Sequence, residues 1–93
     1  MAALDLLGRR WALGVVWQLR SGPRSYGALQ RELEGVSSSV LATRLRELGE
    51  ALLVDTNGNG EYCLTKSGRA LAKALDPVER WSHRWGQEFD DRT

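Results

Sequence analysis

Apolar side chains recur with helical spacing along most of the chain. In the segment 10–20 they fall on almost every side, which is typical of a central and largely buried helix. A short helix over 2–7 is expected before it, ended by Gly8. The Ser-Gly-Pro sequence at 21–23 ends the central helix, because glycine closes helices and proline cannot extend them.

Two short helices joined by a tight turn are predicted next. The first spans about 27–34, with Ser25 or Gly27 as its N-cap and Tyr26 packed back against its first turn. The second spans about 38–51. Its apolar positions are four, three and four residues apart, at Leu41, Leu45, Leu48 and Leu52. Two helices joined by three residues that include a glycine are typical of a helix-turn-helix.

A β-hairpin is predicted directly after the second of these helices. Strands over 53–56 and 61–64 flank the sequence Asn-Gly-Asn-Gly at 57–60, which is a strong hairpin signal. A hairpin in this place is a wing. The predicted fold class is therefore mostly α with a small β-hairpin wing, a winged helix-turn-helix.

Two further helices are expected after the wing. Thr65 caps the first, which runs to about 75. A second begins at Asp76, because an N-cap aspartate, a proline at the first helical position and a glutamate at the third favour a helix start. It extends to about 89, and residues 90–93 are expected to fray.

The composition bounds the class of protein. A length of 93 residues allows one domain, expected over 1–93, and 13 basic against 12 acidic residues give a net charge of +1. This total does not by itself argue for nucleic acid. The segment 20–46, however, holds five arginines and two glutamates, so it is locally basic.

Several functional classes find no support in the sequence. A single cysteine, Cys63, excludes an internal disulfide and a cysteine zinc site, and His83 stands alone among charged residues. We therefore expect no metal, no cofactor and no catalytic residues. No signal peptide and no apolar run of the ~18 residues that span a bilayer occur, so we expect a cytoplasmic protein with no membrane partner.

Four motifs together resemble the HxlR-type winged helix-turn-helix regulators. They are LLGRRW at 6–11, GP at 22–23, S-x-x-V-L-x-x-R-L-R-E-L at 37–48 and EYCLTKSGRAL at 61–71. The resemblance covers roughly 4–85 and implies a dimeric bacterial transcription factor, whose recognition helix (38–51) enters the major groove. It also implies a wing over 53–64 and C-terminal dimerisation helices over 65–89.

The chain departs from that family's pattern at three places. It lacks the amino-terminal cysteine that some members use as a thiol sensor, and its first helix is shorter than usual. Its wing is short and has no basic residue at 57–60. Leu52 stands where the family commonly has the glycine that closes the recognition helix.

The outward face of the recognition helix supplies the candidate DNA-reading residues. With the leucines turned inward, an advance of about 100° per residue places Ala42, Thr43 and Arg46 outward. Arg46 is the candidate for a guanine contact, and Ala42 or Thr43 for a thymine methyl group. Arg44, on the flank, is better placed for phosphate.

Other candidates would hold the DNA backbone or allow close approach. Ser38 and Ser39 are small, and the helix start at Ser37, itself first of all an N-cap, offers free N–H groups to a phosphate. Supporting phosphate contacts are expected from Arg24, Tyr26 and Arg31.

The last helix carries an apolar stripe. Trp81 and Trp85 are four residues apart, with Val78 and Phe89 on nearly the same face. Two interpretations remain open for it, a packed core or a homodimer interface. We prefer the interface, with contributions from Leu4 and Leu7 of the first helix, because exposed tryptophans are unfavourable in a small domain. Trp11 and Trp17 are expected in the core.

The function that these features predict is sequence-specific binding of double-stranded DNA by a homodimeric regulator. The alternative is a winged helix used for protein–protein contact, which the near-neutral charge and the wing without basic residues keep open. An unknown small-molecule effector is possible, and it would bind near the dimer interface.

Overall fold

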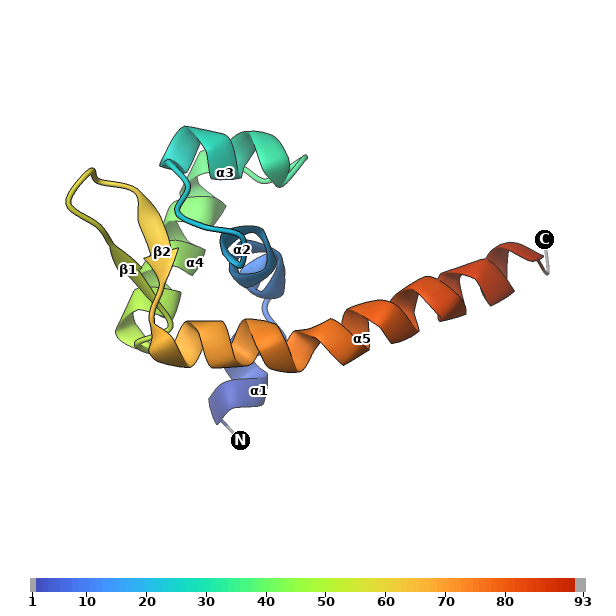
Figure 1. Cartoon of the computed structure of the whole chain (residues 1–93). Helices are drawn as coiled ribbons and strands as arrows, with labels where there is room; N and C mark the ends of the chain where they lie inside the picture. Colours follow the sequence, from blue (N-terminus) through green and yellow to red (C-terminus); the bar gives the residue numbers. More distant parts are fainter. Residues whose placement is uncertain (1, 92–93) are drawn as a thin grey trace.

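The computed structural model describes residues 2–91, with side chains from Asp5 onward. This part of the chain folds as five helices and one hairpin (Figure 1). In chain order they are α1 (Ala2–Leu7), α2 (Ala12–Leu19), α3 (Tyr26–Glu32), α4 (Ser38–Glu50), β1 (Val54–Thr56), β2 (Tyr62–Leu64) and α5 (Lys66–Asp91). The predicted winged helix-turn-helix is confirmed.

Helix α2 lies at the centre, as its all-round apolar pattern predicts. Ala12, Val15 and Val16 have no exposed surface. The other elements place apolar side chains around it, namely Leu29, Leu33, Val36, Leu41, Leu45, Leu48, Val54, Leu64 and Ala72. Of the two tryptophans expected in the core, Trp11 is partly buried and packs against it, whereas Trp17 is partly buried on α2.

Three side-chain caps start the helices that follow α2. Ser25 Oγ accepts from the backbone N–H of Ala28 at 3.1 Å, and Ser37 Oγ from that of Val40 at 3.2 Å. Thr65 Oγ1 accepts from the N–H of Gly68 at 3.0 Å. Each cap satisfies an N–H group that has no partner inside its helix, so each fixes where the helix begins.

The wing is an antiparallel pair in the register Val54↔Leu64, Asp55↔Cys63 and Thr56↔Tyr62. Asn57 organises its tip, because its Oδ1 accepts from the backbone N–H groups of Asn59 (2.9 Å) and Glu61 (3.0 Å). On its other edge, Tyr62 forms a two-bond bridge to Arg24, with N···O distances of 2.8 and 3.0 Å. The segment before α3 is thus a third, one-residue strand, which the sequence pattern does not predict.

Helix α4 ends in a left-handed turn despite the missing glycine. Leu52 has φ 61°, its N–H donates to the Gly49 carbonyl, and the N–H of Leu53 donates to that of Leu48. These two bonds form a Schellman motif, which is usually built on glycine. Leu52 therefore adopts the geometry that a glycine would supply at lower cost.

The expected break between two C-terminal helices is wrong. α5 is continuous over 26 residues, with Pro77 inside it. Proline removes one hydrogen bond, to the carbonyl four residues earlier, but both Pro77 and Lys73 are exposed, so water can satisfy that carbonyl. The first half of α5 packs on the domain, and the second half projects away from it (Figure 1).

Candidate nucleic-acid interface

The two helices of the helix-turn-helix are tied together by Tyr26. Its hydroxyl group, at the start of α3, hydrogen-bonds both the backbone carbonyl and the Oγ of Ser38, the latter at 2.9 Å. Gly35, in the turn between them, has φ 91°, a value that favours glycine. Tyr26, expected at a phosphate, is therefore first a brace that positions the amino-terminal end of α4.

Helix α4 has one buried and one open face, as the leucine spacing predicts. Leu41, Leu45 and Leu48 are buried and hold the helix against α2. Leu52, the fourth leucine of the predicted stripe, lies beyond the end of the helix and is exposed, so the prediction is wrong for that residue. The exposed residues of the opposite face are Ser38, Ser39, Ala42, Arg46 and Glu50. All have small side chains except Arg46 and Glu50, so the first two turns of α4 allow another surface to approach its backbone closely.

Thr43 lies at the edge of this open face and is partly exposed. Its hydroxyl group donates to the carbonyl of Ser39 at 2.9 Å, one turn earlier. With the hydroxyl group engaged in this way, the methyl group is the part of Thr43 that can offer an apolar contact beside Ala42.

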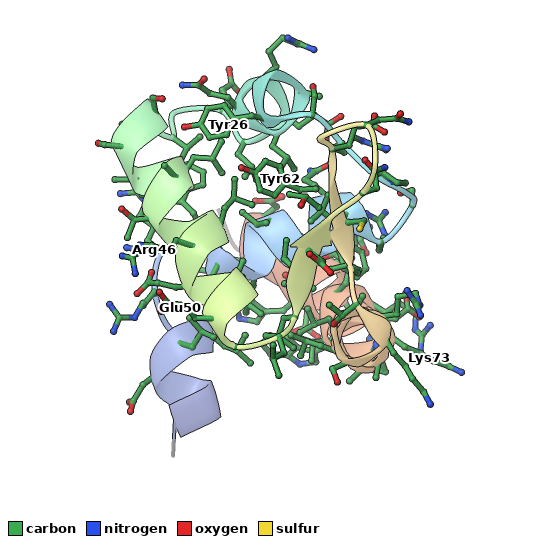
Figure 2. The ribbon with its side chains drawn as sticks, turned by 90° about the vertical axis from the view of Figure 1, so that its left-hand side faces the viewer. Tyr26, Arg46, Glu50, Tyr62 and Lys73 are labelled. Carbon is green, nitrogen blue, oxygen red and sulfur yellow. The ribbon has the colours of Figure 1, made fainter. Side chains whose placement is uncertain are left out.

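Arg46 lies at the centre of the open face. Its Nη1 is 3.1 Å from Oε1 of Glu50, and about 61% of its side chain is exposed (Figure 2). An exposed i,i+4 pair of this kind contributes only about 0.3–0.5 kcal/mol. The guanidinium can therefore leave Glu50 for another acceptor at little cost.

Arg44 is engaged inside the domain. Its Nε donates to the carbonyl of Arg10 at 2.8 Å, and its Nη1 is 2.6 Å from Oε1 of Glu47. Arg9 reaches the other oxygen of Glu47 at 3.3 Å. With about 18% of its side chain exposed, Arg44 connects the loop between α1 and α2 to α4. This arrangement does not favour the phosphate contact expected of it.

The two arginines near α3 differ in whether an internal partner already holds the guanidinium. Arg24 pairs with Glu32 at 3.4 Å and donates to the Pro23 carbonyl at 3.1 Å. Arg31 is exposed, and none of the ion pairs within residues 5–91 includes it. Arg31 is thus the better placed of the two to meet a phosphate.

The start of α4 offers further donors. Ser37 caps the helix as expected, and the serine side chains at 37–39 are all exposed. The backbone N–H groups of Ser38 and Ser39 lie in the first turn, where no carbonyl inside the helix can accept from them. A helix start of this kind attracts anions such as phosphate.

A second exposed surface lies on α5, and we call it the tryptophan face. It consists of Val78, Trp81, Trp85 and Phe89, each more than half exposed. The rings of Trp81 and Trp85 stack at 5.8 Å, and Phe89 follows at 5.8 Å from Trp85. The interpretation of these residues as core packing is therefore wrong for the single chain. Of the other expected dimer residues, Leu7 is partly buried, and the Leu4 side chain lies outside the described residues.

No group of three or more His, Cys, Asp and Glu side chains within 5–91 could hold a metal ion. No helix in the described part of the chain is long and apolar enough to cross a membrane.

Comparison with known proteins agrees with this geometry. A family model described as HxlR-like helix-turn-helix matches residues 6–90. YvaP of Bacillus subtilis, an uncharacterized HTH-type transcriptional regulator, is 33% identical over 89 residues, which cover 89% of this chain and 82% of YvaP. YodB of Bacillus subtilis, also an HTH-type transcriptional regulator, is 27% identical over 95 residues, 96% of this chain and 85% of YodB.

Solved structures show the same fold. Quinone-bound YodB superposes with a TM-score of 0.80 at 29% identity, covering 89% of this chain and 92% of that one. A possible HxlR family transcriptional factor from Thermoplasma volcanium gives a TM-score of 0.83 at 24% identity, over 90% of this chain and 81% of the other.

Proposed function

The chain belongs to the family of HxlR-like helix-turn-helix transcriptional regulators, and from this premise we propose that it binds double-stranded DNA sequence-specifically as a homodimer. The family consists of regulators rather than enzymes. In the proposal, α4 enters the major groove with its first turns against the base edges. A bacterial protein of this kind acts in the cytoplasm, where the DNA lies.

One observation carries the proposal: α4 presents small side chains and Arg46 outward while its leucines hold it down. Arg46 is the side chain of this face that can form a bidentate contact with guanine. Ala42 and Thr43 offer apolar contact to a thymine methyl group. Ser38 and Ser39 leave room for the helix to approach the bases.

Contacts to the DNA phosphate backbone would set the position of the protein on the duplex. We assign them to Arg31, to the N–H groups at the start of α4, and to Arg24 and Tyr26 where these exchange an internal partner for phosphate. Arg44 is left out, because its donors already bind Arg10 and Glu47. The wing contributes no positive charge, because residues 53–64 contain no lysine or arginine.

The homodimer is proposed from the tryptophan face. In one chain, Trp81 and Trp85 expose about half of their surface, a large apolar patch for so small a domain. A second copy of α5 would cover it, with α1 contributing through Leu7 and Leu4. In a dimer on B-DNA the two copies of α4 would lie about 34–36 Å apart, one helical turn.

The test is selection of DNA sites from random duplexes, followed by fluorescence anisotropy with the selected site and a scrambled one. We expect the selected site to bind about 10³-fold more tightly or better, and to be a pseudo-palindrome. Equal affinity for both duplexes would contradict sequence-specific binding.

The alternative, a protein–protein contact module, draws on the acidic character of the wing. Asp55 and Glu61 flank the tip, and the net charge of the whole chain is only +1. This alternative predicts that attraction to DNA disappears at moderate salt and shows no preferred sequence. The same anisotropy titrations, repeated at increasing salt, separate the two functions.

A further inference from the structure

A groove of unassigned function lies on another side of the domain from the open face of α4. It runs between the end of α2, strand β2 and the first half of α5, with a cavity volume of about 380 Å³. A second hollow of about 330 Å³ continues it beyond the end of α2, along the loop 20–23, and shares Arg20, Leu64 and Arg69 with it. In Figure 2, Arg46 and Lys73 point to opposite sides of the molecule, so this groove does not share the surface of Arg46.

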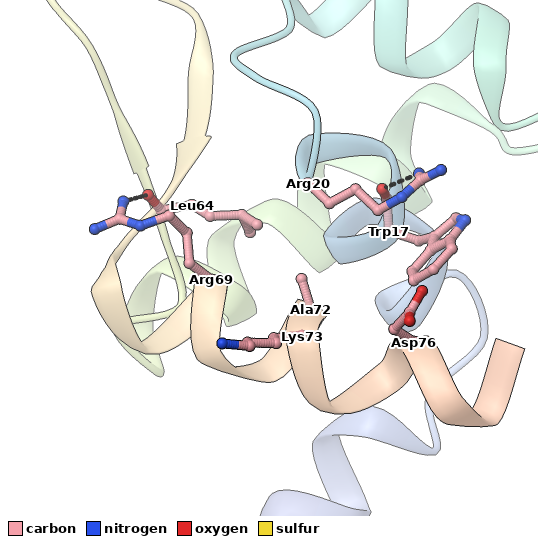
Figure 3. Close-up of a pocket in the computed structure, with 7 residues that line it drawn as sticks. All are labelled: Trp17, Arg20, Leu64, Arg69, Ala72, Lys73 and Asp76. Atoms are coloured by element: carbon pink, nitrogen blue, oxygen red, sulfur yellow. Dashed lines mark hydrogen bonds between the residues drawn. The ribbon is translucent and has the colours of Figure 1, made fainter.

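The lining is apolar below and cationic at the rim. Trp17, Leu64 and Ala72 supply the apolar wall, while Arg20, Arg69 and Lys73 surround it. Figure 3 shows Arg69 and Lys73 on one side of the cavity and Asp76 beside Trp17 on the other.

The cations of the groove have little to neutralise them. The one carboxylate that lines the cavity, Asp76, forms an ion pair with Arg80. None of the ion pairs within residues 5–91 includes Arg20, Arg69 or Lys73. The three side chains therefore create a locally positive potential over an apolar surface.

Both arginines are held in place while keeping donors free. Arg69 Nη1 donates to the carbonyl of Leu64 at 3.1 Å, and Arg20 Nη1 donates to that of Trp17 at 2.7 Å. The Arg20 guanidinium also lies 3.9 Å from the centre of the Trp17 ring. Each guanidinium has five N–H donors, so most remain available to an anion. Positioning of this kind lowers the entropy lost on binding.

We propose that this groove binds a small molecule that combines a carboxylate with an aromatic or aliphatic body. The carboxylate would lie between Arg69 and Lys73, and the apolar body against Trp17, Leu64 and Ala72. Cavities of about 300–1,000 Å³ with mostly apolar walls and few charged groups are typical of small-molecule sites. A plain phosphate or a DNA backbone would leave the apolar wall unused.

The position of the groove gives such a ligand a route to the rest of the molecule. It contacts α5, which carries the tryptophan face, and β2, which forms the wing. Any effect of the ligand on DNA affinity rests on the proposed function, whereas its binding does not. The primary test therefore measures binding to the protein in the absence of DNA.

The probe is 4-phenylbutyrate, titrated into ¹⁵N-labelled protein of residues 1–93 and followed by NMR through the indole N–H of Trp17. We expect a saturable shift with a dissociation constant on the order of 1 mM or below, from the ligand efficiency of small molecules. The matched neutral compound 4-phenylbutanol and inorganic phosphate should each bind at least about tenfold more weakly, because each lacks one of the two required features.

The variant Arg69→Gln/Lys73→Gln should weaken 4-phenylbutyrate binding about tenfold or more, because it removes charge-assisted hydrogen bonds. Arg84→Gln, a charge removed from the projecting half of α5, is the matched control and should bind as the wild type does. Amide spectra of each variant establish that it is folded. If Arg69→Gln/Lys73→Gln loses its fold, Lys73→Gln alone replaces it, with an expected weakening of several fold.

Four results would overturn the proposal. Equal binding of 4-phenylbutanol would show apolar adhesion only, and equal binding of phosphate would show a simple anion contact. If the Trp17 indole resonance does not shift at a 4-phenylbutyrate concentration about ten times the expected dissociation constant, the groove is not a binding site for it. In a parallel anisotropy experiment without ligand, weaker DNA binding by Arg69→Gln/Lys73→Gln would assign the cations to DNA phosphates instead.

Discussion

Gly68, in the first turn of α5, lies directly against the backbone carbonyl of Leu53 at the base of the wing. A Cβ atom at Gly68 would overlap with that oxygen and would come within 3.1 Å of Leu64 Cδ2. The neighbour is backbone rather than a flexible side chain, so it cannot simply turn away. This contact sets how closely α5 approaches the hairpin.

We therefore predict that Gly68→Ala lowers the free energy of unfolding by about 3 kcal/mol, because overlap with backbone forces a shift of a packed element. Urea denaturation followed by circular dichroism measures it. Gly86→Ala is the matched control in the same helix: nothing lies within 4 Å of its added Cβ. It should raise stability by about 0.5–1 kcal/mol, the usual advantage of alanine in a helix. A Gly68→Ala protein as stable as the wild type would contradict the close approach.

The left-handed residue that closes α4 allows an opposite test. Leu52 has φ 61° and is about 73% exposed, so it contributes backbone strain and little packing. Leu52→Gly should stabilise the protein by about 1 kcal/mol. A left-handed L-residue costs roughly 1–2 kcal/mol, and the larger conformational entropy that glycine loses on folding offsets part of the relief. Thermal denaturation measures the change.

Ala51→Gly supplies the control for that change. Ala51 is the neighbouring residue, with an ordinary φ of −82°. Glycine there relieves no strain and should lower stability by about 0.5–1 kcal/mol. If both variants were destabilised alike, strain at Leu52 would not be the reason for any effect.

The sequence contains most of the information for the fold and for the open face of α4. The leucine spacing, the serine caps and the Asn-Gly cluster each depend on local geometry, which is why these elements were predicted to within a few residues. The helix-start signal at Pro77 is local too, but the continuity of the apolar face of α5 outweighs it. The face through Leu75, Val78 and Trp81 continues in register across the proline, and only exposed backbone loses a bond.

Other features depend on long-range contacts and could not be predicted. Arg44 has the helical position of a flanking phosphate ligand, yet its actual partner is the Arg10 carbonyl, 34 residues away. The bridge between Arg24 and Tyr62 and the cationic groove around Arg69 also require the tertiary structure. A one-residue strand has no hydrophobic period, and three cations spread over two helices form no sequence motif.

Removal of the Arg44 side chain should separate bracing from phosphate binding. Arg44→Ala breaks the bonds to Arg10 and Glu47, so we predict a loss of about 1 kcal/mol of stability, since this partly exposed site screens the charges. The dependence of DNA affinity on salt should keep its wild-type slope. If that slope instead fell by about 2 for the dimer, with stability unchanged, Arg44 would be a phosphate ligand as its helical position first indicated.

Disruption of the tryptophan face tests the dimer. Trp81→Ala removes one of the two stacked rings, which have centroids 5.8 Å apart, from the centre of the exposed stripe. We predict a shift from dimer to monomer in sedimentation velocity, because central buried aromatic residues carry much of the energy of an interface. Leu52→Gly, which removes an exposed apolar side chain far along the chain from this face, should leave the dimer intact. An unchanged dimer for Trp81→Ala would assign the interface elsewhere.

The last prediction distinguishes base reading from backbone binding on the surface around α4. With three or four phosphates neutralised by each subunit, the wild-type dimer should show a slope of about −5 to −7 in log affinity against log salt. Arg31→Ala should weaken binding to all duplexes alike and reduce the magnitude of that slope by about 2, one phosphate in each subunit.

Arg46→Ala should instead cost about 1–3 kcal/mol on the selected site and relax the preference at one base position, with a smaller effect on scrambled DNA. Both side chains are exposed and lie outside the core, so each variant should remain folded. Equal weakening of selected and scrambled duplexes by Arg46→Ala would make Arg46 a phosphate ligand, and the reading of bases would then fall to Ala42 and Thr43.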